Sequence, residues 1–214
     1  YKRLGHIVPM TGDGVNDAPA VKEADIGVAM GITGTDVTRQ AADMVLLDDN
    51  FATLVSAVEQ GRGIYANIRK FVRYLLSCNI GEVLTMFLGI IMGMPMVLMP
   101  SQILLVNLVT DGLPAVALGV EPCGEENMRK PPRHKDESFF SGGLMFRIVF
   151  RGILIGICTL ACFTVMLRTG AGLGAARTGA LLTLVMSQLF HVFECKSETK
   201  NIFTVPYFNI PKLI

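Results

Sequence analysis

Hydrophobic and polar positions follow two different patterns along this chain, and the change comes near Arg62. Before it, short apolar runs such as Ile26–Met30 and Met44–Leu47 are bounded by glycine and aspartate, which is typical of strands buried in a parallel sheet. After it, apolar runs extend over about 20 residues, the length that an α-helix needs to cross a bilayer. The chain is therefore predicted to join a soluble α/β part to an α-helical transmembrane bundle of four spans.

Residues 1–60 are predicted to be the second half of a doubly wound α/β sheet. The segment His6–Met10 has the pattern of the end of a strand, and a glycine-rich turn follows it. Turn and N-cap signals at 34–36 and 48–50 separate the later elements. Helices are predicted over Ala18–Ala24, Val37–Ala42 and Ala52–Gly61. The first half of such a sheet is expected to lie outside this chain.

A basic segment leads into the apolar part of the chain. Its members, Arg62, Arg69, Lys70 and Arg73, have helical spacing, and no helix breaker follows them. A stalk helix at 61–73 is therefore predicted to continue into the first span. The transmembrane domain is predicted at 74–194, with spans at about 74–94, 98–120, 144–167 and 178–193. Residues 195–214 are predicted to be a tail that leads into a further span.

The distribution of basic residues predicts an orientation. They cluster in the stalk, in the loop at 129–135 and in the tail at 196–200, whereas the link at 168–177 carries only its two terminal arginines. Positively charged loops favour the cytoplasmic side of a membrane. We therefore expect an integral, multi-pass membrane protein whose soluble part and tail are cytoplasmic.

The composition agrees with a membrane protein and argues against other classes. Of the 214 residues, 51% are hydrophobic and 17% are charged, whereas in soluble domains about a quarter of the residues are charged. A net charge of +1 offers no footprint for nucleic acid. The five cysteines are odd in number and include no Cys-x-x-Cys pair, so they predict no disulfide framework. The expected partner is the lipid bilayer.

Polar side chains interrupt two of the predicted spans. Asn79 and Glu82 lie in the first, and Asn107, Thr110 and Asp111 lie in the second. A carboxylate at the bilayer centre costs about 2.5–3.5 kcal/mol on insertion scales, so such residues indicate an ion or proton site. All five side chains offer oxygen, and none offers sulfur or imidazole. This is the ligand set of a hard cation such as Ca²⁺.

The spacing of these residues predicts a convergent site. Asn79 and Glu82 are three residues apart and are expected to share a helix face. Gly112 and Pro114 are expected to break the second helix and to free backbone carbonyls as further ligands. For Asn79, an ordinary hydrogen bond to a neighbouring helix is an alternative.

The segment Thr11–Ala20 (TGDGVNDAPA) is a second candidate site. Its two glycines allow a tight bend after a strand, and Asp13 and Asp17 are close enough to lie within one turn of each other. Two carboxylates at the C-terminal end of a strand suit Mg²⁺, and open α/β sheets bind ligands at that edge. A solvated turn capped by aspartate is the alternative interpretation.

These motifs together resemble the P-type ATPases of the haloacid-dehalogenase superfamily, and most closely the calcium pumps of the sarcoplasmic-reticulum type. The resemblance covers essentially the whole chain. The strings that carry it are Thr11–Ala20, Asp25–Met30 (DIGVAM), Asn79–Val83 (NIGEV) and Asn107–Ala115 (NLVTDGLPA). It implies that the spans are the fifth to eighth transmembrane helices of a pump, and that residues 1–60 end its phosphorylation domain.

In the soluble part, the resemblance implies a role for each residue of the glycine-rich motif. Asp13 would bind the catalytic Mg²⁺. Asn16 and Asp17 would support the phosphate and metal cluster, while Thr11 and Gly12 would contact phosphoryl oxygens. The motif would thus serve an aspartyl-phosphate cycle driven by ATP.

In the membrane, the resemblance implies that the polar residues bind the transported Ca²⁺. Gln188 stands where these pumps carry a glutamate in the eighth helix. An amide in place of an acid weakens one of the two ion sites of the family, so a single bound ion or altered proton counter-transport is expected. Ordinary packing is the alternative for Gln188, and His191 is expected to be an interfacial histidine and not a ligand.

Several family motifs are absent from the sequence. It contains no Asp-Lys-Thr-Gly-Thr string for the phosphorylated aspartate, no Thr-Gly-Glu of the actuator and no Pro-Glu-Gly-Leu of the fourth helix. The chain alone is therefore expected neither to hydrolyse ATP nor to pump. Its expected partner is the N-terminal part of the same pump, with the actuator, the nucleotide-binding domain and the first four transmembrane helices. The alternatives are a pump for Mn²⁺, Na⁺ or K⁺/H⁺, and a non-catalytic membrane remnant or regulatory partner.

Overall fold

The computed structural model describes residues 1–122, 126–133 and 137–196, which form two compact units. The first unit comprises residues 1–63 and the described part of 123–138. The second comprises residues 64–122 and the described part of 139–214. The predicted tail at 195–214 lies outside the described residues beyond Lys196.

The first unit contains a three-stranded parallel sheet with the order β1-β2-β3. The strands are β1 (Pro9–Gly12), β2 (Ile26–Met30) and β3 (Met44–Leu46), with Thr11 paired to Val28 and Val28 to Met44. The helices α1 (Ala18–Glu23) and α2 (Asp36–Ala41) follow β1 and β2, after short 3₁₀ turns at Lys2–Leu4 and Val15–Asp17. The prediction of parallel strands is confirmed, although only Leu46 is buried in the run Met44–Leu47. The assignment to the haloacid-dehalogenase fold stays a prediction.

The small core of this sheet explains why its strands are apolar. Val28 and Leu46 are buried and pack with Leu54 from the first turns of the next helix. The first strand begins at Pro9 and not at His6, because the ladder starts where Pro9 meets Ile26. The preceding residue, Val8, instead bonds to the side chain and backbone of Asp25.

One long helix, α3 (Phe51–Ile91), replaces three predicted segments. It includes the helix predicted at 52–61, the stalk and the first span, because no proline interrupts the sequence from Phe51 to Ile91. It passes from the first unit to the second between Gly63 and Ile64.

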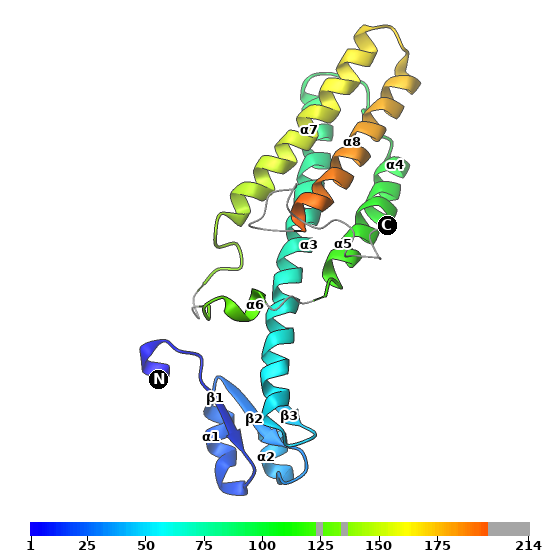
Figure 1. Ribbon diagram of the computed structural model, residues 1–214. Coiled ribbons are helices and arrows are strands. Elements are labelled where there is room, and N and C mark those ends of the chain that lie inside the picture. Colours follow the sequence, from blue (N-terminus) through cyan, green and yellow to red (C-terminus); the bar gives the residue numbers. More distant parts are fainter. Residues whose placement is uncertain (123–125, 134–136, 197–214) are drawn as a thin grey trace. The chain divides into compact units, whose positions relative to one another are not determined.

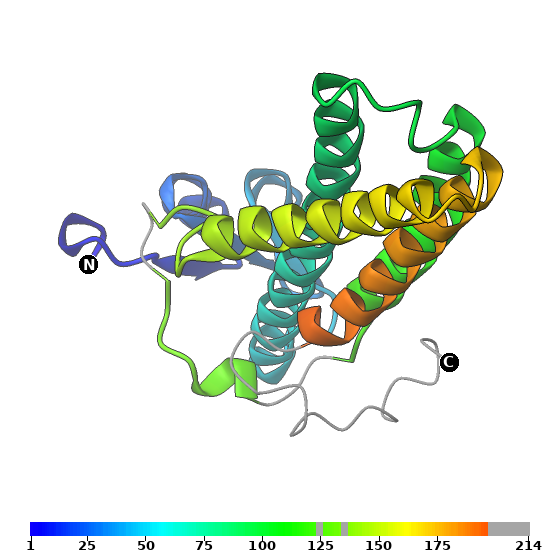
Figure 2. The ribbon, with the colours of Figure 1, turned by 90° about the horizontal axis from the view of Figure 1, so that it is seen from above.

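Within the part of the chain that the structure describes, four helices are long and apolar enough to cross a membrane, as predicted; Figure 1 shows their arrangement. After α3 come a helix over Pro100–Gly119, then α7 (Leu144–Arg168) and α8 (Leu173–Cys195). The short helix α6 (Glu126–Arg129) belongs to the first unit. Helices α7 and α8 form a hairpin and pack along each other through residues such as Phe163, Ala176 and Ala180 (Figure 2).

Helices α3 and α7 approach closely at glycines. A Cβ atom added to Gly152 would lie 2.5 Å from Ile80 Cγ2 and 3.0 Å from the carbonyl oxygen of Ser77. Close approach at small residues is a common means of helix association in membranes, where lipid tails remove the hydrophobic drive. The packing of α7 on α3 therefore depends on a missing side chain.

The predicted break at Gly112 and Pro114 is wrong. The second membrane helix is continuous, with α4 (Pro100–Leu105), a π-helical turn at Val106–Asp111 and α5 (Gly112–Gly119). Pro114 has no N–H to offer the carbonyl of Thr110, four residues earlier, and the wider π turn accommodates this proline without unwinding the helix. The hydroxyl of Tyr74 lies 3.4 Å from this carbonyl oxygen of Thr110.

Candidate functional site

The second unit brings three polar side chains from three helices into one buried cluster. Glu82 comes from α3, Asp111 from the end of the π-helical turn and Gln188 from α8. Their exposed fractions are 4%, 1% and 0%. The amide nitrogen of Gln188 donates to Glu82 Oε1 over 3.0 Å and to Asp111 Oδ2 over 3.3 Å. These three predicted site residues are therefore in direct contact.

Two further side chains complete the contacts of the carboxylates. Asn107 Nδ2 donates to Glu82 Oε2 over 3.1 Å, and the Tyr74 hydroxyl donates to Asp111 Oδ1 over 3.0 Å. Among the described residues, each carboxylate thus accepts a hydrogen bond from Gln188 and one from a second side chain. Sequence reasoning did not select Tyr74, although it lies two helical turns before Glu82, because an aromatic residue in an apolar run is typical of packing.

The charges of this cluster are unusual for a buried site. Across the described parts of the chain, neither Glu82 nor Asp111 forms a salt bridge with lysine, arginine or histidine. Buried carboxylates are generally paired with a cation or bound to a metal ion, because their desolvation is costly. The side-chain oxygen of Gln188 is buried and has no hydrogen-bond partner among the described residues. The cluster therefore combines negative charge with oxygen that is available to a ligand.

Two predicted ligands are not joined to this cluster. Asn79 is exposed while Glu82 is buried, so they do not share the buried face. Residues three apart differ by about 60° around a helix, and the buried side of α3, with Cys78 and Gly81, lies on the far side of Glu82 from Asn79. Thr110 contributes its backbone oxygen to Tyr74 and makes no side-chain hydrogen bond with the described residues. His191, expected at the interface, is 4% exposed and lies against the ring of Tyr74.

The described residues contain no group of three or more His, Cys, Asp or Glu side chains placed to hold a metal ion. A cation between Glu82 and Asp111 would therefore need neutral oxygen ligands as well. The amides of Asn107 and Gln188 are at hydrogen-bond distance from these carboxylates and can supply them. The donor set suits a hard cation that accepts mixed oxygen ligands.

In the first unit, Asp17 closes the glycine-rich turn after β1. Its Oδ2 accepts hydrogen bonds from the backbone N–H of Gly14 over 3.0 Å and of Asp13 over 3.2 Å. The bond from Gly14, followed by that from Asp13, holds the pKa of the Asp17 carboxyl below its ordinary value. Gly12 is required here, because a Cβ atom at this position would lie 2.6 Å from Asp17 Cβ.

The same turn is held from its other side by the start of α2. Thr35 N donates to the carbonyl of Asp13 over 2.9 Å, and the buried Thr38 hydroxyl donates to the carbonyl of Gly14 over 2.7 Å. The carboxylate of Asp13 is left on the exposed side of the turn. Of the other predicted residues, Thr11 lies in β1 directly before its last residue, Gly12, and Asn16 is exposed in the 3₁₀ turn. An exposed carboxylate beside a rigid turn fits Mg²⁺, which keeps several water ligands.

Comparison with known families identifies the family of this chain. Residues 95–214 match the family model described as "Cation transporting ATPase, C-terminus". The chain belongs to the cation-transporting ATPase family. The match includes the second, third and fourth membrane helices and therefore Asn107, Asp111 and Gln188.

Curated members of this ATPase family extend the similarity over almost the whole chain. A calcium-transporting ATPase of Bacillus subtilis is 53% identical over 98% of this chain and 24% of its own length. The endoplasmic reticulum-type calcium-transporting ATPase 2 of Arabidopsis thaliana is 48% identical over 96% of the chain and 20% of its own length. An endoplasmic reticulum calcium ATPase of Aspergillus fumigatus is 60% identical over 73% of the chain and 16% of its own length. The chain thus spans a quarter or less of the length of these relatives.

Proposed function

We propose that this chain is part of an ATP-driven pump that moves Ca²⁺ across a membrane through an aspartyl-phosphate cycle. One observation carries the proposal. Glu82 and Asp111 are buried within helices that are long and apolar enough to cross a membrane, they have no basic partner among the described residues, and they converge on one amide. A desolvated cation is a partner that compensates the charge of such a pair of carboxylates. The names of the relatives, which are calcium-transporting ATPases, support Ca²⁺ as that cation.

The cation would be held by oxygen atoms from three helices. Glu82 and Asp111 supply charge, and Asn107 and Gln188 supply amide oxygens, with Gln188 turning its amide so that the oxygen faces the ion. Asn79 and Thr110 are proposed as further ligands that join when the ion is bound. With an amide at 188, we expect one Ca²⁺ per cycle, because the site contains two carboxylates.

The turn at residues 11–17 would serve the phosphorylation step. Asp13 would hold the catalytic Mg²⁺, which supplies charge neutralisation at a phosphoryl group. Asp17 keeps the turn closed through the N–H groups of Asp13 and Gly14. Gly12 allows the close approach of the backbone, and Thr11 and Asn16 are proposed to contact phosphoryl oxygens.

The phosphorylated aspartate and the ATP site would be provided by other parts of the same pump. We propose an actuator, a nucleotide-binding domain and four further transmembrane helices as these partners, with the lipid bilayer around the four membrane helices of the second unit. The soluble part and the tail would be cytoplasmic, on the side favoured by basic loops. No nucleic acid is involved in this function.

The test is ion-dependent phosphorylation of the full-length protein by ATP, with Ca²⁺, Mn²⁺, Na⁺ and K⁺ compared. We expect Ca²⁺ to trigger phosphorylation, and Asp111→Asn to abolish the Ca²⁺ response at concentrations that saturate the wild type. Leu113→Ala, an exposed apolar change two residues away, is the control and keeps the response. If only another ion triggered phosphorylation, that ion and not Ca²⁺ would be the transported one. If Asp111→Asn kept the Ca²⁺ response of the wild type, the site assignment would be refuted.

A further inference from the structure

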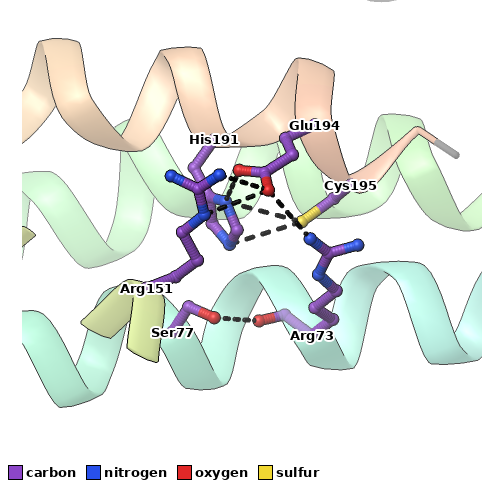
Figure 3. A network of polar contacts seen from close by, with 6 residues as sticks. All are labelled: Arg73, Ser77, Arg151, His191, Glu194 and Cys195. Carbon is purple, nitrogen blue, oxygen red and sulfur yellow. Dashed lines mark hydrogen bonds and ion pairs between the residues drawn. The ribbon is translucent and has the colours of Figure 1, made fainter. Parts of the chain in front are cut away.

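A second polar cluster lies on the same helices and holds one carboxylate between two arginines (Figure 3). Glu194, near the end of α8, accepts hydrogen bonds at Oε1 from Arg151 on α7, over 3.0 Å from Nε and 2.5 Å from NH2. Arg73 on α3 donates to the same oxygen over 3.3 Å. The exposed fraction of the Arg73 side chain is 5% and that of Glu194 is 22%. One carboxylate therefore joins three of the four membrane helices.

The second oxygen of Glu194 is used within α8. His191 Nδ1 lies 3.2 Å from Glu194 Oε2, and its Nε2 lies 3.4 Å from the sulfur of Cys195. The His191 ring packs against Tyr74, with centroids 6.1 Å apart. Tyr74 is the next residue after Arg73 and donates to Asp111. A continuous set of contacts thus runs from Glu194 to the proposed ion site.

The polar residues of α8 connect the Glu194 cluster with the proposed ion site. Gln188, His191 and Glu194 follow each other at intervals of three residues, so neighbours in this series are about 60° apart around the helix and the series covers about 9 Å of rise. Gln188 donates hydrogen bonds to Glu82 and Asp111, while Glu194 accepts hydrogen bonds from arginines on α3 and α7. A charge-assisted contact of this kind resists both rotation and sliding of a helix, because either motion breaks several short bonds together.

We propose that Glu194 is a positioning residue for the ion site. Its contacts with Arg73 and Arg151 set the register of α8 against α3 and α7, and this register places the amide of Gln188 between Glu82 and Asp111. Glu194 does not bind the ion. The inference rests on the proposed function, because it assigns a consequence for ion affinity to a cluster outside the ion site.

The experiment compares Glu194→Gln, Arg151→Met and the double variant in the full-length protein. The Ca²⁺ concentration for half-maximal phosphorylation is measured together with the maximal phosphoenzyme level. We expect each single variant to raise the half-maximal concentration about tenfold or more, the range seen when a partner outside a metal site is lost, with the maximal level retained. The double variant should add little to either single variant, because both remove the same contact.

The matched control is Arg168→Met, at the exposed other end of α7, which should leave the half-maximal concentration unchanged. Arg151→Lys keeps the charge but not the forked geometry, and it should give an intermediate shift. This variant decides the question if Glu194→Gln does not accumulate in the membrane. A fall in the maximal level at an unchanged half-maximal concentration would overturn the inference, since that is the signature of a merely structural role.

The inference and the proposed function fail in different ways. If the Glu194 and Arg151 variants keep wild-type Ca²⁺ affinity while Asp111→Asn loses the response, Glu194 does not position the site and the pump assignment stands. If the wild type shows no Ca²⁺-dependent phosphorylation, both are overturned.

Discussion

Glu82 and Asp111, from different helices, accept hydrogen bonds from the same atom, the amide nitrogen of Gln188. Two carboxylates that share a neutral donor repel each other, and burial strengthens this repulsion. The arrangement is therefore unfavourable by itself and favourable around a cation.

Replacing Gln188 by leucine should weaken ion binding without preventing insertion. The change removes the amide oxygen that is proposed to face the ion, and a buried group that loses its partner costs about 1–3 kcal/mol. We expect a higher Ca²⁺ concentration for half-maximal phosphorylation in the full-length protein. Thr178→Val, an exposed change on the same helix, is the control. Equal affinities of the two variants would argue against Gln188 as a ligand.

Tyr74→Phe should also weaken the site, through a single oxygen atom. The hydroxyl is the donor to Asp111 Oδ1 and also faces the carbonyl of Thr110. A hydrogen bond to a charged group contributes about 1.5–3 kcal/mol, so a loss of Ca²⁺ affinity of roughly tenfold or more is expected from titration of phosphorylation. Tyr1→Phe makes the same chemical change at a residue that is 87% exposed and should have no effect.

Gly152→Ala should destabilise the packing of α7 on α3. The added methyl group would lie 2.5 Å from Ile80 Cγ2, and overpacking of this kind costs about 1–3 kcal/mol. We expect a lower midpoint of thermal unfolding in detergent, and partial recovery in the double variant with Ile80→Ala. Gly174→Ala, where an added Cβ atom meets nothing within 4 Å, is the matched control. A normal midpoint for Gly152→Ala would contradict this close approach.

Asp49 should make the stability of the first unit depend on acid pH. The N–H group of Ile32, opposed by some desolvation and aided by Thr33 and Gly31, lowers the pKa of Asp49 from 3.8 to about 2. A carboxyl whose pKa is lower in the folded state stabilises the fold above its unfolded pKa, and this stabilisation is lost as the pH falls through the folded value. The contribution is therefore complete above about pH 4 and disappears toward pH 2.

The measurement is the midpoint temperature of thermal unfolding of the first unit, for the wild type and for Asp49→Asn, between pH 6 and pH 2. The two proteins should differ at pH 6 and converge as the pH approaches 2. Asp36→Asn, whose carboxylate is 89% exposed, should follow the wild type throughout. A constant difference across the pH range would show that Asp49 acts through its shape and not through its charge.

The sequence predicted the parallel strands and the four membrane helices because each depends on a local pattern. The strand Ile26–Met30 was predicted with its exact bounds, because aspartate before an apolar run and glycine after it mark both ends of a strand. The start of β1 was wrong because it is set by the partner strand, at Pro9 opposite Ile26. The continuity of the helix through Gly112 and Pro114 was also missed, because the π turn and the hydroxyl of Tyr74 compensate for the proline.

The candidate site shows the same division. Glu82 and Asp111 stood out in the sequence because charges in an apolar run are costly wherever they point. Other features depend on which helices face each other. These are the burial of Glu82 in place of Asn79, the hydrogen bond from Tyr74 to Asp111, and the contacts of two arginines with Glu194. For a single acidic residue near the end of a span, the sequence pattern is the same whether the residue joins neighbouring helices or is an ordinary interfacial charge.

The sequence by itself determined that this chain places oxygen-bearing side chains inside membrane helices, and that a glycine-rich turn follows its first strand. Only the tertiary structure decided which of those side chains meet, and that Gln188 stands between the two carboxylates. The reason is physical: burial of a charge is a property of a residue and its neighbours along the chain, whereas convergence depends on the register between helices. That register is set by contacts between residues far apart in sequence, such as Gly152 with Ile80 and Glu194 with Arg73.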